Sequence, residues 1–182
     1  MTCIVALKDK EYLYIGGDRF KSNSYSGRNE LQSKIFKKQD MLLGYSGFVR
    51  FGQIIEKYLE LPIDTREINI DYVIMDLIPA IRKILEEYKY SSTDHNGSIT
   101  GLLLICYKGS IFQIQQNYSV LEYEDYDSIG SGEDYAEGAL YCLFNTYTEL
   151  SPENKIKLAI GAASFHVVSV DDKHIDILKV KI

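Results

Sequence analysis

The sequence predicts an α+β fold built on antiparallel sheets, and the order of its elements is the main reason. Strand-like runs come first, followed by two helical segments, more strands, two further helices and final strands. Such grouping of strands and of helices is typical of α+β proteins. Several neighbouring strands are also joined by links of hairpin length, such as Lys8-Asp9-Lys10 and Lys108-Gly109. At 182 residues and 46% hydrophobic content, we expect one domain spanning residues 1–182.

The first third of the chain is expected to form two pairs of strands. Cys3 to Leu7 pairs with Tyr12 to Gly17, and Ser33 to Lys37 pairs with Met41 to Ser46. The segment between the pairs, Phe20 to Arg28, is polar and rich in turn residues, so it is expected to be a loop or a weak hairpin.

Two helices are expected next. Apolar residues recur at helical spacing in the first, at Phe48, Phe51, Ile55 and Tyr58, and Pro62 ends it. The second has one apolar face, made of Ile74, Ile78, Ile81 and Leu85. Pro79 lies inside that second helix and predicts a kink or a break, because proline lacks the N–H that an α-helix needs.

The second half repeats the order of strands and helices. A polar loop, Ser91 to Ser98, precedes strands at Thr100 to Tyr107 and Ser110 to Gln115, with shorter strands near Val120 and Ser128. Two helices follow, the second starting at the strong signal Ser151-Pro152-Glu153. The remaining expected bounds are Glu133 to Tyr147 for the first helix, an end near Ala163 for the second, and a closing hairpin of Phe165 to Val170 with Ile175 to Val180.

Composition narrows the classes of function. A net charge of −6 with no basic block argues against nucleic acid and anionic membranes as partners, and no apolar run approaches membrane-spanning length. Lys8 and Lys10 come too early for a secretory signal, so we expect a cytoplasmic protein. The three cysteines and three histidines show no metal-ligand spacing, and no P-loop occurs. We therefore expect no cofactor and no metal.

The candidate catalytic residues are a threonine, an acid and a lysine. Thr2 follows Met1, Asp18 ends a strand-like run, and Lys34 lies in the next such run. If Met1 is removed, Thr2 carries both a hydroxyl and a free α-amine, whose pKa of about 7.7–8.0 makes it a usable base near neutral pH. Taken singly, each residue has an ordinary structural explanation; only the joint pattern predicts a hydrolase.

Five motifs follow one another along most of the chain. They are Thr2-Cys3-Ile4-Val5-Ala6-Leu7, Gly16-Gly17-Asp18-Arg19, Ser33-Lys34-Ile35, Leu42-Leu43-Gly44-Tyr45-Ser46-Gly47 and Gly130-Ser131-Gly132. In this order they resemble the N-terminal-nucleophile hydrolases, and within them the proteasome β-subunit and HslV-like branch. A compact bacterial and phage group of proteasome-like proteins is similar as well.

The resemblance implies a four-layer αββα sandwich and a role for each matched residue. Thr2 is the expected nucleophile, Lys34 favours its deprotonated form, and Asp18 holds Lys34. The backbone N–H of Gly47, or of Phe48 one residue on, stabilises the oxyanion, and Ser131 hydrogen-bonds the Thr2 amine. These roles imply a threonine-type peptidase that acts on peptides or unfolded proteins.

The resemblance also implies a homo-oligomer, with a separate ATPase partner for any unfolding of substrates. Aromatic residues on the first two helices, Phe48, Tyr58 and Tyr72, give modest independent support for an interface.

One departure from the family pattern keeps alternatives open. The family has an Asp and a Ser after the last helix, whereas Ala163-Ser164-Phe165-His166-Val167 contains no acid. A catalytically inactive structural or assembly subunit with the same fold is one alternative, and a small-molecule amidase is another. Cys3 as a thiol nucleophile is a distant possibility, because strand alternation points it to the opposite face from Thr2.

Overall fold

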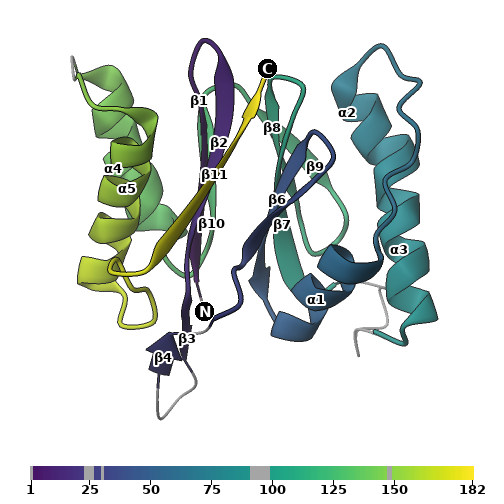
Figure 1. Ribbon diagram of the computed structural model, residues 1–182, viewed down its shortest axis with the longest axis horizontal. Coiled ribbons are helices and arrows are strands. Elements are labelled where there is room, and N and C mark those ends of the chain that lie inside the picture. The colour runs from purple at the N-terminus through teal and green to yellow at the C-terminus, as the bar shows by residue number, and fades with distance from the viewer. Residues whose placement is uncertain (1, 23–26, 30, 91–98, 147–148) are drawn as a thin grey trace.

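The computed structural model describes residues 2–22, 27–29, 31–90, 99–146 and 149–182. Two antiparallel sheets face each other, and helices cover the outer face of each sheet (Figure 1). The predicted α+β class and the four-layer αββα arrangement are therefore confirmed. No helix in these ranges is long and apolar enough to cross a membrane.

The first sheet combines strands from both ends of the sequence. Its order is β10-β1-β2-β11, and all of its neighbours are antiparallel. Along β1, Cys3, Val5 and Leu7 face the helices, whereas Ile4 and Ala6 face the other sheet. The strands are β1 (Cys3–Lys8), β2 (Tyr12–Asp18), β10 (Tyr126–Gly130) and β11 (Ile175–Lys181).

The second sheet is a meander whose strands follow one another in sequence, in the order β5-β6-β7-β8-β9. Its strands are β5 (Ile35–Lys38), β6 (Met41–Gly47), β7 (Gly101–Tyr107), β8 (Ser110–Ile114) and β9 (Val120–Tyr123). The segment Phe20 to Arg28, expected as a loop or a weak hairpin, corresponds to two short paired strands, β3 (Phe20–Ser22) and β4 (Gly27–Asn29). The predicted loop Ser91 to Ser98 lies outside the described residues.

Two glycines allow the sheets to approach closely at one end. A Cβ on Gly44 of β6 would lie 2.6 Å from Cγ2 of Ile4 in the other sheet. A Cβ on Gly17 of β2 would lie 2.6 Å from Cδ1 of Ile4 in its own sheet and 3.1 Å from Cγ2 of Ile35 in the other. Since real Cβ atoms do not approach other atoms so closely, larger residues here would push the sheets apart. The ends of β2 and of the segment before β5 are thereby brought together.

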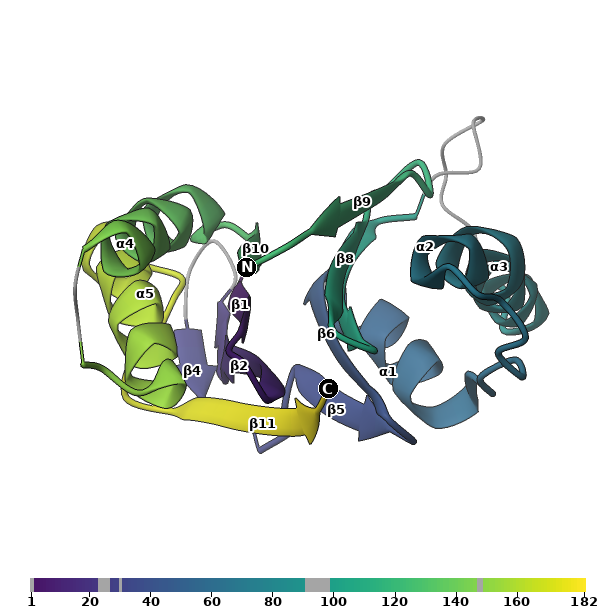
Figure 2. The ribbon, with the colours of Figure 1, turned by 90° about the horizontal axis from the view of Figure 1, so that it is seen from above.

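The helices lie on opposite sides of the paired sheets, as Figure 2 shows. On the second sheet, the predicted break at Pro79 is a π-helical turn, in which the N–H of Ile78 bonds to the carbonyl of Val73. The wider turn accommodates the proline. The first sheet is covered by α4 (Glu133–Asn145) and α5 (Pro152–His166), and the second by α1 (Val49–Tyr58), α2 (Asn69–Tyr72), the π-turn η1 (Val73–Leu77) and α3 (Ile78–Glu87).

The closing hairpin was predicted wrongly. The first residues of its expected first strand instead continue α5 to His166. The ring of His166 stacks on Tyr135 of α4, with the two ring centroids 4.4 Å apart. Phe165 is 86% exposed, so its hydrophobicity does not indicate a buried strand. The final strand β11 pairs with β2.

Two details of the predicted helix faces were also wrong. Ile74 is 47% exposed, because the π-turn rotates it away from the apolar face. Tyr72 is only 1% exposed and belongs to the core, while Phe48 (66%) and Tyr58 (44%) are exposed as expected of interface residues.

Candidate active site

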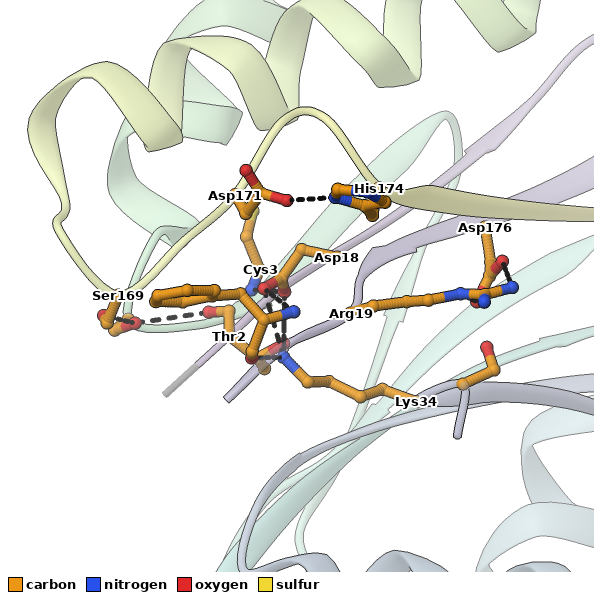
Figure 3. Close-up of polar contacts among 12 residues, drawn as sticks. Thr2, Cys3, Asp18, Arg19, Lys34, Ser169, Asp171, His174 and Asp176 are labelled. Carbon is orange, nitrogen blue, oxygen red and sulfur yellow. Dashed lines mark hydrogen bonds and ion pairs between the residues drawn. The ribbon is translucent and has the colours of Figure 1, made fainter. Parts of the chain in front are cut away.

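Thr2, Asp18 and Lys34 meet at the end of the sandwich where the sheets approach. The Thr2 hydroxyl donates a hydrogen bond to Asp18 Oδ1 at 2.5 Å and accepts one from Lys34 Nζ at 2.6 Å (Figure 3). Thr2 precedes β1, Asp18 ends β2, and Lys34 precedes β5. Two residues come from the first sheet and the third from the second, so the contact bridges the sheets.

Asp18 is fully buried, and its carboxylate accepts hydrogen bonds from several donors. They are the backbone N–H groups of Cys3 at 2.8 Å and Phe20 at 3.1 Å, and Lys34 Nζ at 3.1 Å from both oxygens. A buried carboxylate is costly unless paired and hydrogen-bonded. These hydrogen bonds compensate for the burial of the carboxylate and fix Asp18 between the nucleophile and the lysine.

Hydrogen bonds hold both the backbone and the side chain of Lys34. Its backbone carbonyl accepts from the N–H of Tyr45 at 3.1 Å, and its ammonium also donates to the carbonyl of Phe20. The side chain is only 12% exposed. A largely desolvated positive charge in contact with the Thr2 hydroxyl favours the alkoxide form of that hydroxyl.

Gly47 lies beside Thr2 in the wall of a cavity of about 420 Å³. Its φ of +103° is in the region that favours glycine, and a Cβ there would lie 2.4 Å from the carbonyl oxygen of Thr100. A side chain at this position would therefore disturb the turn that leads from β6 into α1. The lining residues are Thr2, Phe20, Lys34, Tyr45, Ser46, Gly47, Phe48, Val49, Thr100 and Gly130.

Ser131 also contacts Thr2, but through a different atom from the one expected. Its hydroxyl donates to the Thr2 carbonyl oxygen at 3.3 Å, whereas the expected partner was the Thr2 amine. Ser131 does not cap α4, because Gly132 occupies the N-cap of that helix. Gly130 has φ +105°, and a Cβ there would lie 2.3 Å from the same carbonyl oxygen, so the chain can approach Thr2 this closely only with glycine.

Sequence reasoning missed Ser169. This serine is 1% exposed, and its hydroxyl lies 3.3 Å from that of Ser131. It was missed because α5 ends about one turn later than expected, so the segment after the helix contains Ser169 and Asp171. The later end of α5 could have been predicted from Ala163 and Ser164, because these small residues are compatible with a helix and continue it. Asp171 contacts His174 at 2.9 Å.

The cysteine alternative does not fit the structure. Cys3 is fully buried against the helices, and burial, together with the nearby Asp18 carboxylate, raises the pKa of its thiol far above the ordinary value. A thiol in such surroundings is a poor nucleophile. Within the described ranges, no group of three or more His, Cys, Asp or Glu side chains could hold a metal ion.

Comparisons with known proteins agree with the fold. The chain is similar in structure to Thiobacillus denitrificans BPH in complex with epoxomicin, with a TM-score of 0.84 and 18% identity over 98% of both chains. It is also similar to eukaryotic HslV from Trypanosoma brucei (TM-score 0.71, 18% identity, 99% of both chains). Anbu, the ancestral β-subunit from Yersinia bercovieri, gives a TM-score of 0.65 at 14% identity over 98% of this chain and 81% of that one.

A search of curated protein sequences found no significant match. The family model described as "Proteasome subunit", however, matches residues 1–178, which is nearly the whole chain. The chain therefore belongs to the proteasome subunit family.

Proposed function

We propose that this chain, once the peptide bond between Met1 and Thr2 is cleaved, is a threonine-type peptide hydrolase. The observation that carries the proposal is the contact of the Thr2 hydroxyl with both Asp18 and Lys34 at the wall of a cavity. A buried hydroxyl that touches an ammonium and a carboxylate is suited to nucleophilic attack.

The reaction follows from the groups present. Thr2 Oγ1 attacks the peptide carbonyl carbon, and its proton passes to the freed α-amine of Thr2. The oxyanion that forms is stabilised by the backbone N–H of Gly47, a type of donor that is typically worth about 10²–10³ in rate. When the tetrahedral adduct collapses, the leaving amine takes the proton and an ester on Thr2 remains. Water then gives a proton to the Thr2 amine and attacks the ester; the bond from the acyl carbon to Oγ1 breaks, Oγ1 takes that proton back and the acid product leaves.

The cavity favours a large apolar side chain next to the scissile bond. Aromatic and aliphatic residues, Phe20, Tyr45, Phe48 and Val49, form much of its lining, and Lys34 is engaged by Thr2 and Asp18. Apolar lining gains free energy by burying apolar substrate surface. We therefore expect peptides with a Leu, Phe or Tyr at this position to be better substrates than those with Asp or Lys.

Mass spectrometry of the protein from its native host, with and without epoxomicin, tests the proposal. That compound was present in the structure of the similar BPH protein. The expected result is a chain that starts at Thr2 and gains one inhibitor mass on its first peptide, with the Thr2→Ala variant unlabelled. A chain that keeps Met1 and forms no adduct contradicts the proposal and favours an inactive assembly subunit. Turnover of small amides without turnover of peptides would favour the amidase.

The proposal includes self-association of the chain and a separate ATPase partner. Exposed Phe48 and Tyr58, on either end of α1, are suited to a contact between copies of the chain. A ring or similar array of such copies restricts access to the nucleophile. Delivery of folded substrates then requires an ATPase supplied by another protein.

A further inference from the structure

A second polar bridge lies beside the contacts of Thr2 and also joins the two sheets. Asp176 of β11 lies opposite Gly17 of β2. Its carboxylate accepts from Arg19 Nε at 2.7 Å and from Arg19 Nη2 (Figure 3). A hydrogen bond from Ser33 is among the causes that lower the pKa of the same carboxylate. Arg19 directly follows Asp18, and Ser33 directly precedes Lys34. One carboxylate thus holds the neighbours of two proposed catalytic residues.

The Asp176 carboxylate is ionised at neutral pH. Burial by itself raises the pKa of this group, but the hydrogen bonds from Arg19 and Ser33, with the charge of Arg19, outweigh burial and lower the pKa below its ordinary value. The backbone N–H of Arg19 also donates to the carbonyl of His174 at 3.0 Å, which continues the pairing of β2 with the start of β11. The bridge is therefore anchored in the first sheet.

The segment that carries Lys34 packs on that sheet through Ile35, but among the described residues it makes few other polar contacts with the sheet. Lys34 precedes β5, and its neighbour Gln32 contacts α1 through Gln53 and Glu56, each at 3.1 Å. Those contacts, like the bond from Tyr45 to the Lys34 carbonyl, fix the segment to its own side of the sandwich. Apart from the lysine side chain itself, Ser33 makes the polar link from this segment to the opposite sheet.

We propose that Asp176 is a positioning residue, which sets the place of the Lys34 ammonium relative to the Thr2 hydroxyl by holding Arg19 and Ser33 together. The inference rests on the proposed function, because it concerns the same catalytic contact. Asp176 makes no described contact with Thr2 and acts only through the residues that flank Asp18 and Lys34.

The Asp176→Asn variant tests the inference. It keeps the shape of the side chain and removes the charge that Arg19 and Ser33 share. A displacement of about 1 Å in a catalytic group can cost roughly a hundredfold, so we expect kcat to fall between about tenfold and a hundredfold with KM changed less than twofold. The rising limb of the pH–rate profile should move to higher pH, because Lys34 no longer stabilises the alkoxide as well. Asp176→Glu, which keeps the charge, should recover part of the rate.

Two further variants separate positioning from general stability. Ser33→Ala removes one hydroxyl only, and in an Asp176→Asn background it should add little, since both changes break one bridge. Lys179 lies on the same strand as Asp176 and pairs with Glu153 of α5, so Lys179→Gln breaks an ion pair away from the site and should leave kcat and the pH profile unchanged. An unaltered kcat and pH profile in folded Asp176→Asn or Ser33→Ala protein would overturn the inference.

Crystal structures keep this test independent of the proposed function. In wild type, Lys34 Nζ lies 2.6 Å from Thr2 Oγ1, and we expect this distance to exceed hydrogen-bonding range in Asp176→Asn. An unchanged distance contradicts the positioning role whether or not the protein is active. Wild-type protein that starts at Thr2 yet shows no turnover contradicts only the proposed function, and the distance then decides the role of Asp176.

Discussion

At the scale of single residues, the proposed chemistry depends on one ammonium group. Lys34→Ala removes the charge that contacts Thr2 Oγ1, so we expect hydrolysis to fall by at least about a hundredfold, as for the loss of an oxyanion donor. The control is Lys37→Ala, an exposed lysine on β5 whose loss should leave turnover unchanged. Steady-state kinetics with circular dichroism checks both. Turnover close to wild type in Lys34→Ala would show that the site is misassigned.

Gly47 permits a second test at this scale. Gly47→Ala places a Cβ 2.4 Å from the carbonyl of Thr100 in a backbone with φ +103°, so the turn must shift and the N–H proposed for the oxyanion moves with it. We expect a lower kcat and a destabilisation of about 1–3 kcal/mol. Gly161→Ala is the matched control, because a Cβ there meets nothing closer than 4.0 Å. Equal kcat in the two variants would exclude the oxyanion role of Gly47.

Residue patterns identified part of this site and missed the rest for a physical reason. Thr2, Asp18 and Lys34 could be predicted because each lies at a recognisable place beside a strand. Ser169 was missed because the end of α5 was misplaced, and Asp176 was missed because its partner Arg19 lies 157 residues away in the sequence. Contacts over such distances depend on which strands pair, and local periodicity does not determine that pairing.

At the scale of elements, the strongest local signals predicted the right structures. The π-turn before Pro79 follows from a missing N–H, and α5 begins at the Ser151-Pro152 signal, where the Ser151 hydroxyl accepts from the N–H of Asn154. The end of α5 was wrong because apolar Phe165 and Val168 suggested a strand, although they are 86% and 95% exposed. Hydrophobicity does not distinguish a core position from an exposed apolar surface.

Helix α4 offers a stability test that is separate from the site. Gly138 lies inside this helix, and an added Cβ meets nothing within 4 Å. Alanine costs less backbone entropy in a helix than glycine, so Gly138→Ala should raise the free energy of unfolding by about 0.5–1 kcal/mol. Thermal or denaturant unfolding measures this change. A destabilised variant would indicate that another copy of the chain packs on this part of α4.

At the scale of the whole molecule, a buried acid predicts how stability depends on pH. Asp127 of β10 is 3% exposed, and burial, reinforced by Glu137 and Glu133, raises its pKa to about 7. A raised pKa means that the folded state binds the proton more tightly than the unfolded chain does. Stability should therefore decrease as pH rises from about 4 to about 7 and then level off, with a total loss of up to about 4 kcal/mol from this group.

Asp127→Asn should remove most of that decrease and stabilise the protein at pH 8, because it replaces the buried charge by a neutral group. The exposed Asp125→Asn, two residues earlier, is the control and should follow wild type. Unfolding by denaturant at several pH values gives the comparison. A parallel decline in wild type and Asp127→Asn would assign the effect to other acids, such as Glu133 and Glu137, whose pKa values burial also raises.

Copies of the whole chain are also expected to associate with one another. We expect light scattering at micromolar concentration to show a species several times larger than the 20.8 kDa chain. A charged residue in place of exposed Phe48 or Tyr58 should weaken that assembly, because these aromatics are the proposed contact. A single 20.8 kDa species that persists as concentration rises would contradict the proposed ring or array of copies.

The place of β11 in the first sheet has a consequence for biosynthesis. Arg19 and Asp176 are 157 residues apart, and the whole second sheet is made between them. At roughly 5–20 residues per second, a ribosome needs about 8–30 s to cover that interval. During this time β2 lacks its final partner and the Ser33–Asp176 link cannot form. A nascent chain should thus fold its second sheet first, and the nucleophile should become competent only after translation of β11.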